Sequence, residues 1–181
     1  SAFDQWGRAD IDFYPENLRN AIDTMNKLVY DNINNGVYRT GFATTQIAYE
    51  QSCHDLFDTL NELENRLSSQ RYLIDDQITE ADWRLFPTLV RFDAIYHGHF
   101  KCNRKRLVDY PNLWAYTREL YQVDGVAATV NMDHIKTHYY GSHKAINPTG
   151  IVPLGPEIDF SSTHNRNSSQ SKPALRNLHR I

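Results

Sequence analysis

The sequence has few of the features that stabilise secreted proteins or anchor proteins in membranes. It contains only two cysteines in 181 residues, Cys53 and Cys102, which excludes a disulfide framework. No apolar run approaches the ~20 residues of a membrane-spanning helix. The N-terminus also lacks the basic-then-apolar pattern of a signal peptide. We therefore expect a cytoplasmic protein whose two cysteines are thiols in a reducing compartment.

Patterns typical of β-sheets are also missing. No stretch alternates apolar and polar residues strictly beside a hairpin dipeptide, whereas apolar residues recur at the three- and four-residue spacing of amphipathic helices. The sequence therefore predicts an all-α bundle of about six or seven helices. The expected helices span 15–33 (ending in Asn34-Asn35-Gly36), Thr44 or Thr45 to Leu67, Thr79 to about Tyr96 with a bend at Pro87, 112–121, 125–130 and 132–139.

One helix start is marked by a reciprocal cap. Thr79 can accept a hydrogen bond from the backbone of Asp82, whose carboxylate can reach back to the N–H of Thr79. This capping box precedes an apolar run that begins with Trp83. It predicts where the helix begins and at what angle the chain enters it.

The distribution of charge divides the chain. The formal net charge is −3, but residues 161–181 carry four basic and no acidic side chains, which leaves −7 on the remainder. We expect a helical domain at 1–140, an extended segment at 141–166 packed on that domain, and a flexible basic tail at 167–181. An acidic helical body argues against a nucleic-acid partner.

The reactive side chains give weak signals for catalysis. Cys53 falls on an apolar helical face, and Cys102 lies in a basic loop without a nucleophile turn or a CxxC pair, so both thiols are interpreted as structural. His134, His138 and His143 invite a metal interpretation, but no glutamate follows the first histidine as in the catalytic zinc motif. We expect no metal site.

Tyrosine is the most informative residue type. Eleven tyrosines are many for this length, and Tyr38 and the pair Tyr139-Tyr140 fall outside the predicted buried faces. A phenol offers an apolar ring with a donor and an acceptor, which suits an aromatic hydroxylated ligand. Tyrosines that merely bridge the core and the solvent are the alternative.

Several consecutive motifs form a recognisable set. They are 35–44 (NGVYRTGFAT), 79–86 (TEADWRLF), 89–94 (LVRFDA), 98–103 (GHFKCN), 131–140 (NMDHIKTHYY) and 147–156 (NPTGIVPLGP). The chain resembles the C-terminal helical domain of glutathione transferases, and more narrowly that of the omega-like, xi-class glutathionyl-hydroquinone reductases. The resemblance covers roughly residues 1–166.

The resemblance implies half of a two-domain, dimeric enzyme. In that family a thioredoxin-like N-terminal domain binds glutathione and supplies the catalytic cysteine, while the helical domain holds the aromatic hydroquinone. Tyr38 and Tyr139 match the tyrosines that line this pocket, with Tyr140 as the substitute if the register differs by one residue. The sequence shows no thioredoxin-like half, so no catalytic residue is expected in this chain, and the chain alone should be inactive.

Two functions remain open from the sequence. The first is the substrate-binding half of a glutathione-dependent reductase or transferase that forms a homodimer and uses glutathione and an aromatic hydroquinone. The second is a non-catalytic glutathione-transferase-like module that binds other proteins. The tyrosine set favours the first, because an interaction module has no need of it.

Overall fold

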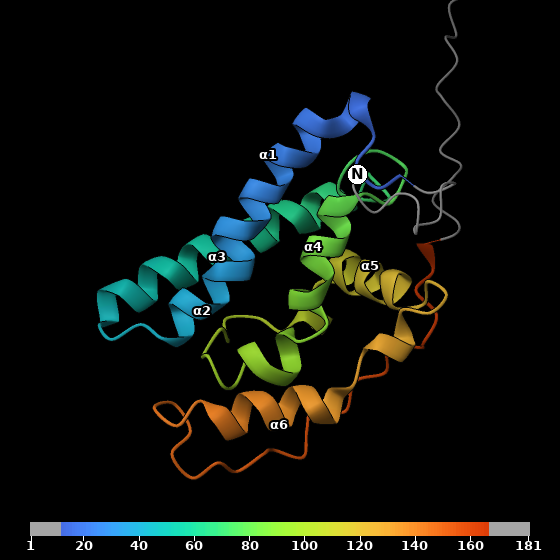
Figure 1. Ribbon diagram of the computed structural model, residues 1–181. Coiled ribbons are helices and arrows are strands. Elements are labelled where there is room, and N and C mark those ends of the chain that lie inside the picture. Colours follow the sequence, from blue (N-terminus) through green and yellow to red (C-terminus); the bar gives the residue numbers. More distant parts are fainter. Residues whose placement is uncertain (1–11, 167–181) are drawn as a thin grey trace, which may run out of the picture.

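The structure is a computed structural model that describes residues 12–166, and these residues contain helices and no strand (Figure 1). This confirms the all-α class. The α-helices are α1 (Arg19–Val29), α2 (Asn35–Gly41), α3 (Gln46–Leu67), α4 (Glu80–Leu89), α5 (Pro111–Tyr121) and α6 (Met132–Ser142). Single 3₁₀ turns occur at Glu16–Leu18, Leu107–Asp109 and Ala127–Thr129, and π-helical segments at Tyr30–Asn34 and Phe92–Tyr96.

The first predicted helix does not stop where the sequence indicated. α1 continues through the π-helical segment into α2, so the chain forms one rod up to Gly41. The six α-helices therefore make five separate rods, fewer than the six or seven predicted. The reason is tertiary: the side chain of Asn34 donates to the Thr88 hydroxyl at 2.7 Å, and Gly36 is buried. These contacts override the local tendency of Asn-Asn-Gly to end a helix.

α3 is the long helix of the bundle and returns beside the α1–α2 rod (Figure 1). It begins as predicted at Thr45, whose hydroxyl accepts from the backbone of Ala48 at 3.2 Å. Its apolar face is buried through most of its length. The buried residues on that face include Cys53, Leu56, Phe57, Leu60, Leu63 and Leu67.

The capping box lies in the core rather than at the surface. The N–H of Thr79 donates to the Asp82 carboxylate at 2.7 Å, and both halves of the box are present. The other carboxylate oxygen accepts from the Leu73 backbone at 3.0 Å and from the Tyr116 hydroxyl at 2.7 Å. Burial raises the pKa of Asp82, and its hydrogen bonds oppose that rise. Asp82 therefore joins α4 to α5 as well as capping α4.

α6 contacts the bundle mainly through one buried residue, Tyr139, which faces the π-helical segment. After turns at 143–149, residues 150–159 run without helix along the outer side of α6, and the chain returns to α5 (Figure 1). Lys136 binds the Leu154 carbonyl at 2.7 Å, and Phe160 packs on α5. The predicted tail, 167–181, lies outside the described residues.

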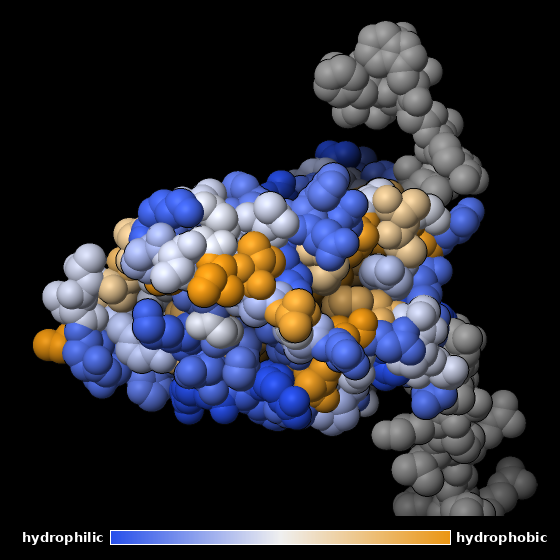
Figure 2. Space-filling view, turned by 90° about the horizontal axis from the view of Figure 1, so that it is seen from below, coloured by the Kyte–Doolittle hydropathy of each residue, from blue (hydrophilic) through white to orange (hydrophobic). Residues whose placement is uncertain are grey.

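Two surface properties complete the fold. On the face seen from below, apolar side chains form several separate groups between polar ones (Figure 2). Among the described residues, no helix combines the length and apolar character needed to cross a membrane.

Candidate functional site

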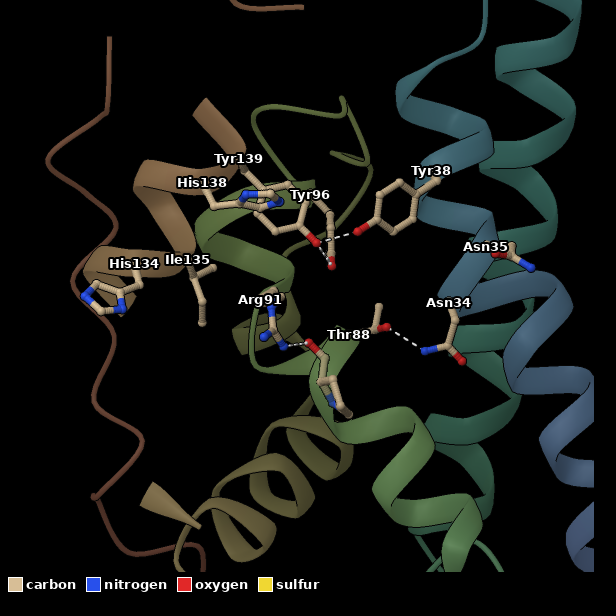
Figure 3. Close-up of a pocket in the computed structure, with 11 residues that line it drawn as sticks. Asn34, Asn35, Tyr38, Thr88, Arg91, Tyr96, His134, Ile135, His138 and Tyr139 are labelled. Atoms are coloured by element: carbon tan, nitrogen blue, oxygen red, sulfur yellow. Dashed lines mark hydrogen bonds between the residues drawn. The ribbon is translucent and has the colours of Figure 1, made fainter. Parts of the chain in front are cut away.

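A cavity of about 580 Å³ opens between the α1–α2 rod, the end of α4 and α6 (Figure 3). Side chains from segments far apart in the sequence line it. The lining residues are Asn34, Asn35, Tyr38, Pro87, Thr88, Arg91, Tyr96, His134, Ile135, His138 and Tyr139. The cavity is large enough for an aromatic molecule of one or two rings.

Three tyrosines form a chain of hydrogen bonds at one end of the cavity. The Tyr38 and Tyr139 hydroxyl oxygens are 2.5 Å apart, and those of Tyr96 and Tyr139 are 2.9 Å apart. Tyr139 and Tyr96 are buried, whereas 39% of Tyr38 is exposed. The structure thus brings Tyr38 and Tyr139 together, and Tyr38 is the most exposed of the three tyrosines.

Aromatic packing fixes this chain of phenols in place. The Tyr38 ring packs edge-on to Phe100 at a centroid distance of 5.3 Å, and Phe100 stacks on Tyr96 at 5.5 Å. Gly41, at the end of α2, lets Phe100 approach the backbone, since a Cβ at Gly41 would lie 2.3 Å from the Phe100 ring. The positions of the Tyr38 and Tyr96 rings therefore depend on a glycine.

The phenols of Tyr38 and Tyr96 remain protonated at neutral pH, because the pKa of each is raised. Burial, followed by the hydrogen bond with Tyr139, raises the pKa of Tyr38 to about 12. The same two causes raise the pKa of Tyr96, and the positive charge of Arg91 opposes the rise in both cases. Protonated phenols can donate hydrogen bonds to an oxygen of a bound ligand.

Polar and basic side chains line the rest of the cavity. Arg91 donates from Nη1 to the Pro87 carbonyl at 2.7 Å, and Asn34 holds the Thr88 hydroxyl. α6 contributes His134 and His138, one turn apart on the face toward the cavity. The cavity is therefore lined both by the three phenols and by the Arg91 guanidinium, which lies below the tyrosine hydroxyls in Figure 3.

Tyr140 lies outside this cavity. Its hydroxyl donates to the Ala94 carbonyl at 3.3 Å, and its ring packs on His99 at 4.5 Å. It lines a separate cavity of about 300 Å³ beneath the extended segment that includes Pro153 and Pro156. The two neighbouring tyrosines of the predicted site thus point into different cavities.

The three histidines considered for metal binding do not converge. His134 and His138 line the large cavity, whereas His143 Nδ1 lies 3.1 Å from His99 Nε2. Within residues 12–166 there is no group of three His, Cys, Asp or Glu side chains that could hold a metal ion.

Both thiols are enclosed by the core. Cys53 is 4% exposed and Cys102 is fully buried. Burial raises the pKa of each thiol, so neither is a ready nucleophile. This arrangement suits the structural role expected for both.

Sequence reasoning missed Tyr96 and Arg91. Tyr96 was placed at the end of a long predicted helix, and only the π-helical segment Phe92–Tyr96 turns it toward Tyr139. Arg91 lies in a motif that carries the family resemblance but was not singled out. For the histidines the sequence did give an indication. The four-residue spacing of His134 and His138 predicts that both lie on one face of a helix.

The chain is similar in sequence to known proteins. Residues 46–119 match the family model for the glutathione S-transferase C-terminal domain. The chain is 58% identical over 156 residues to the glutathionyl-hydroquinone reductase PcpF of Sphingobium chlorophenolicum, covering 86% of this chain and 50% of that protein. It is 50% identical over 166 residues to the glutathionyl-hydroquinone reductase YqjG of Escherichia coli K12, covering 92% of this chain and 51% of YqjG.

Solved structures show the same relationship. The glutathione-bound structure of YqjG matches with a TM-score of 0.90 and 49% identity over 93% of this chain and 55% of that one. A xi-class glutathione transferase from Natrialba magadii matches with a TM-score of 0.89 and 47% identity, covering 91% of this chain and 50% of its own. The chain spans about half the length of the curated relatives it matches. The chain belongs to the family of glutathionyl-hydroquinone reductases, which are xi-class glutathione transferases, and it corresponds to their C-terminal helical domain.

Proposed function

We propose that this chain is the substrate-binding half of a glutathione-dependent glutathionyl-hydroquinone reductase. The observation that carries the proposal is the chain of phenols from Tyr38 through Tyr139 to Tyr96 at the end of a cavity of about 580 Å³. Protonated phenols beside aromatic rings suit a flat ligand that carries hydroxyl groups. The names of the relatives point to the same class of substrate.

The catalytic thiol is proposed to lie outside these 181 residues. Attack on a glutathionyl sulfur requires an accessible thiolate, and the thiols of Cys53 and Cys102 are buried with raised pKa values. In the proposed reaction a cysteine thiolate forms a mixed disulfide with the glutathionyl sulfur. The sulfur–carbon bond breaks, and the ring carbon takes up a proton. A second glutathione then reduces the mixed disulfide, giving glutathione disulfide and the free thiol.

The helical half would orient the ring during this exchange. A hydroquinone hydroxyl accepts a hydrogen bond from Tyr38, the more exposed phenol, while Tyr139 and Tyr96 hold the Tyr38 hydroxyl in position. Such positioning lowers the entropic cost of bringing the sulfur to the attacking thiolate. Tyr140 takes no part, because it lines the other cavity.

Titration of the chain with 1,4-hydroquinone under anaerobic conditions tests the proposal, with calorimetry as the measurement. Tyr38→Phe and Tyr139→Phe should each weaken binding by about tenfold. The first removes the proposed hydrogen bond to the ligand, and the second removes the hydrogen bond that holds the Tyr38 hydroxyl in position. Tyr140→Phe is the matched control and should change the affinity by less than twofold.

Two outcomes would overturn the proposal. The first is that all three variants bind 1,4-hydroquinone as tightly as the unmodified chain does. This would favour the protein-interaction module instead. The second is turnover of a glutathionyl-hydroquinone by the 181 residues alone, which would place the chemistry within this chain.

A further inference from the structure

The charge of the cavity lining is one-sided. Among its described lining residues there is one guanidinium, two imidazoles and no carboxylate. This is unexpected in a helical body that is acidic overall, and a cavity of one sign concentrates ligands of the opposite sign. Neutral hydroquinones make no use of this charge.

We propose that the cavity selects aromatic substrates that carry a carboxylate on the ring, and that Arg91 determines this specificity. The inference rests on the proposed function and names the class of hydroquinone that the cavity would bind. The hydroxyl end of such a ring lies at Tyr38 and Tyr139, and the carboxylate lies at Arg91.

The position of Arg91 supports this assignment. Arg91 follows the end of α4, where the last carbonyl groups of a helix lack intrahelical partners. Its Nη1 donates to one of these carbonyls, that of Pro87, at 2.7 Å. This bond uses one of the five N–H groups of the guanidinium and fixes its place, while the planar fork suits a carboxylate.

The local field remains positive despite the helix end. A helix C-terminus carries about half a negative charge, which one guanidinium exceeds. Arg91 opposes the rise in the pKa of both Tyr38 and Tyr96, so its charge reaches both phenols. In Figure 3, Arg91 lies below these hydroxyls, with Ile135 on one side and Thr88 on the other. A single ring can therefore face both groups.

Glutathione is a second source of carboxylates, since the tripeptide carries two. The shared chemistry is a carboxylate held by a guanidinium, and the two sources require separate titrations. The probes are 1,4-hydroquinone, 2,5-dihydroxybenzoate and glutathione. The first two share the dihydroxylated ring and differ by the carboxylate.

The chain should bind 2,5-dihydroxybenzoate about tenfold more tightly than 1,4-hydroquinone at low salt, and the preference should shrink as salt is added. Arg91→Gln should remove this preference, so that the two ring compounds bind with similar affinity. Arg91→Lys, which keeps the charge without the fork, should retain part of it. Arg84→Gln is the matched control, because Arg84 lies on α4, pairs with Glu80 and does not line the cavity.

Each other result overturns the inference. Equal affinity for the two ring compounds, with both dependent on Tyr38, removes the charge selectivity but leaves the proposed function intact. A loss of glutathione binding in Arg91→Gln without a change for 2,5-dihydroxybenzoate assigns the guanidinium to the tripeptide. Failure of both ring compounds to bind refutes both the inference and the proposed function. Thermal unfolding of each variant, followed by circular dichroism, verifies that it folds.

Discussion

Replacing Gly41 with alanine should destabilise the protein, although the same replacement at Gly36 should not. Both glycines are buried in α2. A new Cβ at Gly36 would lie 3.7 Å from the nearest atoms of Leu56, an ordinary contact. A new Cβ at Gly41 would lie 2.3, 2.5 and 2.7 Å from three atoms of Phe100, distances that side chains do not adopt.

Two opposing effects determine the net change. Alanine is better than glycine inside a helix by up to about 1 kcal/mol, and less at a helix end such as Gly41. Overpacking a rigid core costs about 1–3 kcal/mol or more. Phe100 is fully buried and packed against Tyr38, Tyr96 and Phe42, so it cannot rotate away without moving them. We expect Gly41→Ala to lower the free energy of unfolding by about 2 kcal/mol.

Urea unfolding followed by circular dichroism at 222 nm measures the effect, and Gly36→Ala is the matched control. The control should be neutral or stabilising by up to about 1 kcal/mol. Adding Phe100→Leu to Gly41→Ala should recover part of the loss, since it removes atoms from the crowded site. A Gly41→Ala protein at least as stable as the unmodified chain would refute the reasoning. The Gly41→Ala protein should also bind hydroquinone less tightly, because Phe100 packs against the Tyr38 ring.

Two further predictions concern buried charge and buried sulfur. Burial raises the pKa of Glu119, but hydrogen bonds from Arg71, Tyr72 and Arg166 outweigh this and leave it below its ordinary value. The stabilisation is therefore present above about pH 4 and lost as the pH falls through the lowered pKa. Glu119→Gln should cost about 3 kcal/mol at pH 7 and flatten the acid limb of the stability curve. Separately, Cys53 and Cys102 should not react with 5,5′-dithiobis(2-nitrobenzoate) in the native protein, and both should react in urea.

The Glu119 prediction has a matched control at an exposed ion pair. For Glu119→Gln the control is Asp31→Asn, which removes an exposed ion pair with Lys27 and should change the free energy of unfolding little. Equal losses of unfolding free energy in Glu119→Gln and Asp31→Asn would show that the buried ion pairs of Glu119 stabilise the protein no more than the exposed pair does. Rapid labelling of either native thiol would contradict its burial, and would also reopen the assignment of the catalytic cysteine to a region outside this chain.

The sequence by itself determined the fold class and the ends of several helices. Helical spacing of apolar residues is a local property, and caps such as Thr45 and the Thr79–Asp82 pair act within three residues, so both can be read from the chain. The resemblance to the glutathionyl-hydroquinone reductases also required only consecutive motifs. It points to Tyr38 and Tyr139, whose hydroxyl oxygens lie 2.5 Å apart in the structure.

The tertiary structure decided what depends on contacts between distant segments. The α1–α2 rod continues through Asn34 because its side chain is bonded to α4. Tyr139 and Tyr140 are adjacent in sequence, yet one joins the phenol chain and the other lines a separate cavity, because neighbouring residues of a helix point about 100° apart. Arg91 faces the cavity only because it follows the end of α4. Local patterns determine where helices form, whereas the direction of each side chain depends on the packing of the whole bundle.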